Sequence, residues 1–376
     1  FTALPPQTYN TYTLGFDLSW ELDIWGKVRD GASAALADTQ AAAAALQGAR
    51  FSLAANIAKA WFDAIEAELQ VQLAEETYAS FTDTADVIQR RYERGVSPAL
   101  DLRLARAQAA SAKANLELRY QARDAAVRNL EVLLGRYPSN EIALSSNLPV
   151  ITAPVPAGLP SELLERRPDL IVAERALAAS GKRVSEARKQ MLPSISLTGS
   201  YGYSSQQVGE LLTGGFSVWS LAGNAVQPIF QGRKISANIE RTKAIAIQRL
   251  AEYGQAALDA FAEVEITLQA EEYLVNRVDA LEIAAKENTE AENTAWARYE
   301  RGLTDIITVL ESQRRAFTSK SELLTTRNEL LRNRINLYLA LGGDFGTEKV
   351  PEAEVTTPLG PQALPLEEPP YVSQAE

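Results

Sequence analysis

The side chains in this chain that could do chemistry are mostly carboxylates. Its 376 residues include 48 Asp and Glu and 37 Lys and Arg, but no Cys and no His. This excludes thiolate and imidazole nucleophiles, histidine general bases and nearly all zinc sites. A carboxylate-dependent enzyme remains as a weak alternative, since no paired Asp/Glu motif falls in a predicted pocket. The composition therefore leaves only carboxylate chemistry open.

A second chemically conspicuous pattern is a charged pentapeptide, RYERG, which stands at Arg91–Gly95 and again at Arg298–Gly302. Shifting the chain by 207 residues aligns 91–135 with 298–342 without a gap, and both segments end in Leu-Gly. One long unit is therefore used twice, unlike the short units of a solenoid. Gly95 and Gly302 are placed as left-handed glycines that end a helix. RYERG is thus predicted to mark the far tips of two helical hairpins.

Long helices must carry these tips. All 17 prolines avoid the tracts between Pro6 and Pro98 and between Pro228 and Pro351, and proline breaks helix interiors. A helix from 27 to 92 would span roughly 100 Å. Both tracts show the spacing of a coiled-coil seam; its members are Leu53, Ile57, Ala60, Ala64, Ala67, Val71, Ala74 and Tyr78 in the first, and Ile247, Leu250, Gly254, Ala257, Phe261, Val264 and Leu268 in the second.

Three stretches alternate with period two and predict strands. They are TYTLGFDLSWELDIWG from Thr11, PSISLTGSYGYSS from Pro193, and a weaker one at about 216–230. In the first, Tyr12, Phe16, Leu18 and Trp20 alternate with Asp17, Ser19, Glu21 and Asp23. Such long strands, apolar on one face and rich in aromatics, are typical of outer-membrane β-barrels. No apolar run is long enough for a transmembrane helix.

The net charge of −11, without any run of Lys or Arg, argues against nucleic acid as a partner. The pattern of helices and strands alone leaves two classes of protein open. One is a periplasmic adaptor or soluble coiled-coil scaffold, which also contains long hairpins. The other is a membrane channel, and the alternating aromatic strands favour it.

The duplicated order of strand, helix, turn and helix resembles the TolC-like outer-membrane efflux factors, especially the lipoprotein branch that works with resistance-nodulation-division pumps. The residues that carry the resemblance are GLPSELLERRPDL, within 156–170, the strand-to-helix segment WELDIWGKVR, and QPIFQGR before the second long helix. The resemblance implies a mixed α and transmembrane β fold. In it, an outer-membrane β-barrel, with four strands per protomer in the family and three visible here, continues into a long α-helical barrel, and the assembly is a trimer.

The resemblance also implies partners and a location. They are a periplasmic adaptor protein, an inner-membrane pump of resistance-nodulation-division type and outer-membrane lipid, in the outer membrane of a Gram-negative bacterium and extending into the periplasm. The first strand would precede Phe1, together with any lipid-bearing cysteine. The expected segments are 1–26, a barrel strand and extracellular loop; 27–135, the first hairpin; 136–168, an equatorial collar; 169–192, a helix of the α-barrel; 193–230, a strand pair; 231–342, the second hairpin; and 343–376, a second equatorial segment.

The family pattern assigns roles to particular residues. Those of the periplasmic gate are Tyr92, Arg94, Asp101, Tyr299 and Arg301. Glu311 would form an acidic ring in the pore, because three copies would meet around one axis. Asp17, Ser19, Glu21 and Asp23 would face the water of the barrel lumen, and Tyr12, Phe16, Leu18 and Trp20 would face lipid. The implied function is a passive exit duct for substrates delivered by the pump, and for such a channel we expect no catalysis, no cofactor and no metal.

Overall fold

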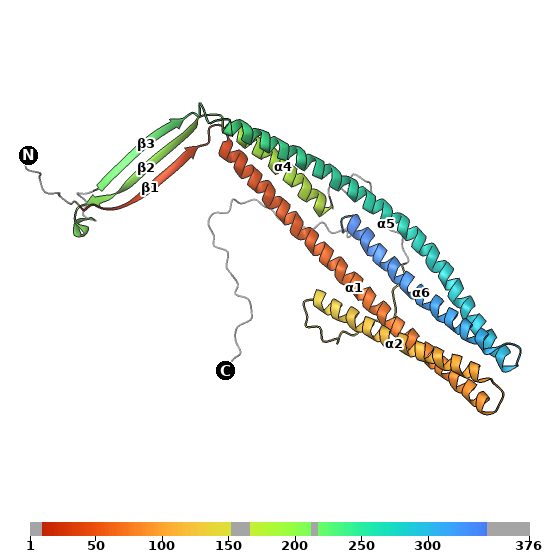
Figure 1. The fold of residues 1–376 in the computed structure, drawn as a ribbon. Coiled ribbons are helices and arrows are strands. Elements are labelled where there is room, and N and C mark those ends of the chain that lie inside the picture. The colour runs from red at the N-terminus through yellow and green to blue at the C-terminus, as the bar shows by residue number, and fades with distance from the viewer. Residues whose placement is uncertain (1–9, 152–165, 212–216, 344–376) are drawn as a thin grey trace, which may run out of the picture. The chain divides into compact units, whose positions relative to one another are not determined.

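A computed structural model describes residues 10–151, 166–211 and 217–343 (Figure 1). The N-terminal half contains β1 (Tyr12–Leu22), α1 (Lys27–Glu93) and α2 (Ala99–Leu133). The rest contains α4 (Pro168–Lys189), β2 (Ser194–Ser205), a short 3-10 helix, η1 (Val208–Glu210), β3 (Ser217–Val226), α5 (Lys234–Glu300) and α6 (Ile306–Ala340). Among the described residues, no helix has both the length and the apolar character needed to cross a bilayer.

The duplication predicted from the sequence is confirmed element by element. Helices α1 and α5 both contain 67 residues, and α2 and α6 both contain 35. Each helix of the second hairpin begins and ends 207 residues after its counterpart in the first. The two hairpins are therefore the same unit, and differences between equivalent positions report where the halves have taken separate roles.

The RYERG segments end the two long helices as predicted. Gly95 has φ 73° and Gly302 has φ 71°, in the left-handed region that favours glycine. In the first copy Gly95 N donates to Tyr92 O at 2.8 Å, and Val96 N donates to Arg91 O at 2.9 Å. The second copy repeats both bonds, from Gly302 N to Tyr299 O and from Leu303 N to Arg298 O. This pair of bonds is the Schellman motif, so RYERG is a helix stop followed by a chain reversal.

The three strands form one antiparallel sheet in the order β1–β2–β3 (Figure 1). Phe16 pairs with Tyr201, which pairs in turn with Trp219. One row along, Asp17 pairs with Ser200, and Ser200 with Ser220. Directly opposite residues share a face of the sheet. One face is therefore aromatic and aliphatic, while the other carries hydroxyls and carboxylates.

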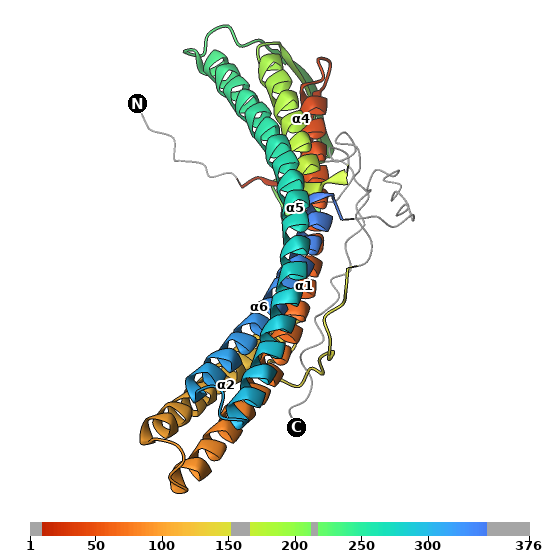
Figure 2. The ribbon, with the colours of Figure 1, turned by 90° about the vertical axis from the view of Figure 1, so that its right-hand side faces the viewer.

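Helix α1 is the central packing element, because it contacts α2, α4 and α6. Its first third packs on α4 through Ala34, Ala37 and Ala179, and small side chains there let the helices approach closely. Farther along, Ala60 and Ala64 pack against Val127 and Leu130 of α2 and its neighbours. Figure 2 shows α4 alongside the strand-proximal parts of α1 and α5, with α6 alongside the distal part of α5. The long helices are thus supported on successive segments by different partners.

The two hairpins share an apolar cluster toward their tips, which includes Ile88 of α1 and Val309 of α6, and polar contacts between α1 and α6. Gln70 of α1 donates to Ser321 O at 3.0 Å, and Gln313 of α6 donates to Thr84 Oγ1 at 3.0 Å. Asp63 accepts from Asn328 at 2.8 Å and also pairs with Arg332. This α1–α6 seam therefore combines individual hydrogen bonds with apolar packing.

Part of the predicted collar lies in the described residues. Glu131 is buried in the last turn of α2. Its carboxylate accepts hydrogen bonds from two amides of the segment after the helix, Asn140 N at 2.8 Å and Glu141 N at 2.9 Å. Ile142 and Leu144 then pack on the α1–α2 core. Segment 136–151 is therefore bound to the hairpin. The remaining collar segments, 152–165 and 344–376, lie outside the described residues.

One sequence expectation needs correction. The third strand was expected to extend to Phe230 but ends at Val226, because Pro228 has no N–H to donate to a ladder. The predicted seam of α5 is covered unevenly within the chain. Ile247 and Leu250 are exposed, whereas Val264 is buried against Leu337 at the end of α6.

Candidate functional site

The five residues predicted for the gate lie at the two hairpin tips but differ in their burial. Tyr299 is buried in an apolar cluster that also contains Leu102 of α2 and Ile306 of α6. Asp101 is half-buried in the first turn of α2. The other three predicted residues, Tyr92, Arg94 and Arg301, are exposed. Within the described part of the chain, no hydrogen bond or ion pair joins these five side chains to one another.

A sixth tip residue, Arg91, was missed by the sequence reasoning. Its guanidinium carbon lies 4.8 Å from the centroid of the Tyr299 ring, within the range of a cation–π contact. The ring also makes an edge-on contact with Trp296 at 5.9 Å. Arg91 belongs to α1 and Tyr299 to α5, so this contact ties one hairpin tip to the other. Its place in the first RYERG copy was the available signal, but duplication alone does not show which copies touch.

Both tips present the same exposed apolar pair beyond the helix stop. Val96 and Leu100 are 62% and 61% exposed, and the positions 207 residues later, Leu303 and Ile307, are 63% and 53% exposed. Exposed apolar residues at equivalent places of two repeats form a repeated surface rather than scattered exceptions. The chain therefore offers two similar contact points at the ends of its hairpins.

Glu311, the predicted acid of the pore, is not a free carboxylate. It accepts hydrogen bonds from Arg315 Nε at 2.8 Å and from both Nε and Nη2 of Arg314, at 2.9 and 2.8 Å. These bonds, first from Arg315 and then from Arg314, lower the pKa of Glu311 below its ordinary value. At neutral pH the carboxylate is ionised but flanked by two cations. A ring of three copies would therefore carry compensating positive charge.

Thr308 stands where the first hairpin has Asp101, and it takes part in the cap at the start of α6. Asp305 is the N-cap of α6 and accepts from Thr308 N at 2.9 Å and from Thr308 Oγ1 at 2.7 Å. These bonds, with the side-chain hydroxyl first, lower the pKa of Asp305. The equivalent N-cap of α2 is Pro98, which makes no side-chain cap. The divergence between the two tips thus begins with different helix caps.

The sheet register separates most of the predicted barrel residues onto two faces. Phe16, Leu18 and Trp20 lie on the apolar face and are 83%, 68% and 57% exposed within the chain. Tyr12 shares that face by alternation. Asp17, Ser19 and Glu21 lie on the polar face, opposite Ser200, Thr198 and Ser196 respectively. This two-faced sheet matches the requirements of a wall between lipid and water.

Asp23 has a different environment from the other predicted lumen residues. It follows the end of β1, and its carboxylate accepts from Val28 N at 2.9 Å and Arg29 N at 2.8 Å. Partial burial opposes ionisation, but the hydrogen bonds from the Arg29 and Val28 amides lower its pKa overall. Glu21 is paired with Lys27 at 2.5 Å. Both acids therefore help to join β1 to α1.

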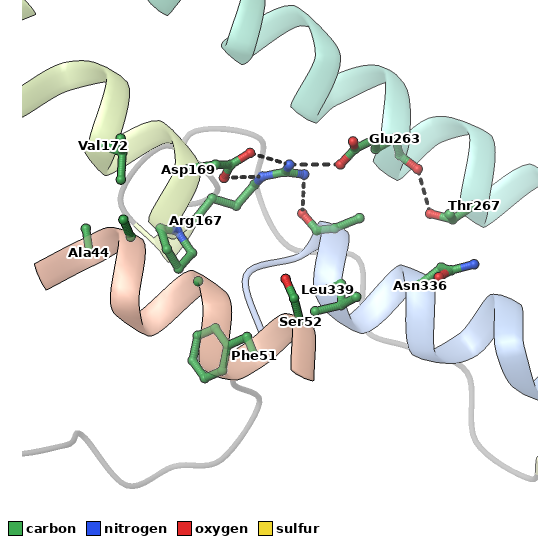
Figure 3. A pocket seen from close by; sticks show the side chains of 14 residues that line it. Ala44, Phe51, Ser52, Arg167, Asp169, Val172, Glu263, Thr267, Asn336 and Leu339 are labelled. Carbon is green, nitrogen blue, oxygen red and sulfur yellow. Dashed lines mark hydrogen bonds and ion pairs between the residues drawn. The ribbon is translucent and has the colours of Figure 1, made fainter. Parts of the chain in front are cut away.

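A cavity of about 680 Å³ lies where α4 begins and α6 ends (Figure 3). Arg167 reaches into it and donates to both oxygens of Asp169, at 3.0 and 2.7 Å, to Glu263 at 2.8 Å, and to Ala340 O at 3.0 Å. The guanidinium thus holds the start of α4, the middle of α5 and the end of α6 together. Because these contacts engage the guanidinium, the cavity lies at a structural junction of three helices.

Comparison with known proteins identifies the family. Residues 2–136 and 159–343 match the family described as outer membrane efflux protein. The chain is 32% identical to the probable efflux pump outer membrane protein TtgC of Pseudomonas putida over 354 residues, covering 93% of this chain and 72% of TtgC. It is also 32% identical to the outer membrane protein OprJ of Pseudomonas aeruginosa, covering 89% and 71% of the two chains.

Solved structures agree with the sequence comparison. The outer-membrane channel OprN superposes with a TM-score of 0.83 at 28% identity, covering 91% of this chain and 78% of OprN. The open state of the Neisseria gonorrhoeae MtrE outer membrane channel gives a TM-score of 0.77 at 30% identity, covering 89% and 80%. The fold and the family expected from the sequence are confirmed: the chain belongs to the outer membrane efflux protein family.

Proposed function

We propose that the chain is one protomer of a trimeric outer-membrane exit duct, which passively conducts substrates from an inner-membrane pump and a periplasmic adaptor. The observation that carries the proposal is a single chain that combines a two-faced sheet with two long hairpins. Efflux channels among its relatives and structural neighbours support it. In this role the chain needs no catalysis and no cofactor, since the pump supplies the driving force.

The sheet itself favours a ring of copies. Within the described residues, β1 and β3 each have one edge without a partner strand. Unpaired backbone groups are not tolerated in lipid, so these edges must pair with other strands. A cyclic trimer closes the sheet by the same contact repeated three times. A periplasmic adaptor or coiled-coil scaffold has no use for such a sheet and does not fit the family.

The repeated tips are the proposed contact with the adaptor. Val96 with Leu100, and Leu303 with Ile307, would present six similar apolar points per trimer. The predicted gate residues Tyr92, Arg94, Asp101, Tyr299 and Arg301 lie on the same ends of the hairpins. Arg91 over Tyr299 adds a contact between hairpins that adaptor binding can break, because such contacts contribute only about 0.5–2 kcal/mol. Partner contact would thereby open the mouth.

Single-channel conductance in planar bilayers tests the gate. Replacing Asp101→Ala together with Tyr299→Phe should raise the conductance of the closed channel, because it removes the polar groups available to hold neighbouring helices together. The matched control is Asp279→Ala with Tyr273→Phe, which makes the same chemical changes at exposed positions of α5. Equal conductance of the gate variant, the control and the wild type would show that these residues do not close the channel.

A further inference from the structure

The junction between the strands and the helices carries a charge pattern unlike that of the whole chain. The chain has a net charge of −11. Yet at the ends of α1, α4 and α5 that adjoin the sheet, six basic residues outnumber four acids. The basic residues are Lys27, Arg29, Arg188, Lys189, Arg233 and Lys234, and the acids are Glu21, Asp23, Asp30 and Glu186, of which Glu21 and Asp23 line a pocket with Lys234. Lys27 pairs with Glu21, and Lys189 pairs with Asp30. The other four basic side chains have no ion pair among the described residues.

The internal duplication isolates the start of α5 as the unusual part of this junction. At the start of α1, Asp23 supplies a carboxylate to the helix amides. The residue 207 positions later is Phe230, which is 88% exposed, and its neighbour Ile229 is 94% exposed. From 227 to 239 the chain contains two basic residues and no acid. The second junction is therefore cationic and apolar where the first is balanced and self-capped.

Arg233 also stands in a conformation that disfavours it. Its φ is 67°, in the left-handed region, and the equivalent residue of the first half is Gly26 with φ 74°. A side chain at such a position strains the backbone, and glycine would remove that strain. The guanidinium is exposed and has no hydrogen-bond or ion-pair partner among the described residues. Nothing within the described chain compensates for the strained arginine.

The apolar face of the sheet continues toward this junction. Trp20 is 57% exposed on that face, and Trp25 just beyond β1 is 45% exposed, with its ring nitrogen donating to Pro193 O at 2.8 Å. A tryptophan with an anchored N–H and an open ring is typical of the membrane–water boundary. Because the helices lead into the periplasm, this boundary is the periplasmic leaflet of the outer membrane.

We propose that Ile229, Phe230, Arg233 and Lys234 form a docking surface for the headgroup of an anionic phospholipid in that leaflet. The proposal rests on the outer-membrane location of the proposed function. The two cations bind the lipid phosphate, and the two apolar side chains enter the acyl boundary below it. Charge complementarity and continuity with the lipid-facing sheet select lipid as the occupant over a second copy of the chain.

The test uses the trimer in nanodiscs of phosphatidylcholine alone or with phosphatidylglycerol, and counts retained lipid by native mass spectrometry. The variant Arg233→Gly with Lys234→Gln removes both charges and relieves the strain, so the protein still folds. Each basic residue near an anionic surface contributes about 5-fold in affinity, so the pair should lower phosphatidylglycerol affinity about 30-fold. The loss should shrink as salt rises.

The matched control is Arg103→Gln with Lys286→Gln, which removes the same charge from exposed positions on α2 and α5. Lys286 lies roughly 80 Å along α5 from Lys234. Equal retention of phosphatidylglycerol by the two variants would overturn the proposal. Displacement of the bound phosphatidylglycerol by inorganic phosphate at a similar concentration would also overturn it. If the wild-type protein failed to insert into a bilayer and conduct ions, that result would contradict the proposed channel function instead.

A second variant, Ile229→Ser with Phe230→Ser, separates lipid from a neighbouring protomer as the occupant. With lipid on this surface, the variant should retain fewer phosphatidylglycerol molecules while remaining a trimer. Dissociation of the trimer in both kinds of nanodisc, with lipid retention per protomer unchanged, would assign the surface to a second copy and overturn the proposal.

Discussion

At the scale of single residues, buried polar groups fix the relative placement of the helices. Arg167 is 6% exposed and holds three helices through one guanidinium. A planar fork of five donors can satisfy a carboxylate and a helix carbonyl at once, which an ammonium group cannot do with the same geometry.

The charge of Glu292 in α5, unlike that of Arg167, is only partly compensated by its neighbours. The Glu292 side chain lines a cavity of about 140 Å³ with Lys320 of α6 and Glu76 of α1.

Glu292 should make stability depend on pH. Burial raises its pKa above the ordinary value, and Lys320 only partly opposes this. A carboxyl whose pKa is raised by folding stabilises the fold below its unfolded pKa, and this contribution is lost as pH rises through the folded pKa. Glu292→Gln should therefore raise the midpoint of thermal unfolding at pH 7 and flatten the decline that begins as pH rises above the ordinary glutamate pKa of about 4.3.

Thermal unfolding followed by circular dichroism at several pH values measures this effect. Glu265→Gln is the control, since Glu265 is an exposed carboxylate on the same helix. If both variants follow the wild-type pH dependence, Glu292 is well solvated or fully neutralised by Lys320.

At the scale of elements, the helix stops carry the hairpin geometry. Gly302 has φ 71° with open space around the position of a Cβ, so alanine there meets only backbone strain. Gly302→Ala should destabilise the second hairpin by about 1–2 kcal/mol. Gly181 lies inside α4, also with open space, and Gly181→Ala should stabilise by about 0.4–1 kcal/mol. Urea unfolding gives both values, and the same sign for the two variants would contradict the role of Gly302.

The sequence predicted these elements well where one local rule determined them. Proline-free tracts predicted α1 and α5, and two-residue alternation predicted β1 and β2. Both rules are reliable because periodicity and proline chemistry act within a few residues. The contact of Arg91 with Tyr299 was missed because it depends on how two distant hairpins pack. The apolar seam of α5 predicted a packed helix face, but the pattern does not say which chain covers Ile247.

At the scale of the whole molecule, repetition is combined with divergence. Two equal hairpins supply helices of matching length, which a symmetrical wall requires. The differences fall at the ends of the repeat: Asp23 against Phe230 beside the strands, and Pro98 against Asp305 at the tips. Three copies around an axis turn each such difference into a ring. We propose that such rings influence which ions pass and where the partners bind.

The charge of one such ring can be measured. If Glu311 faces the pore, Glu311→Gln leaves Arg314 and Arg315 uncompensated in every protomer. Under a KCl gradient, the reversal potential should then shift toward the equilibrium potential of chloride. Arg314→Gln should shift it toward the equilibrium potential of potassium. Both shifts should be larger at 0.01 M than at 1 M salt, because the screening length falls from about 30 to about 3 Å. Glu265→Gln is the control. Shifts no larger than in this control would place Glu311 away from the conducting path, and the narrow part of the pore would then owe its selectivity to other residues.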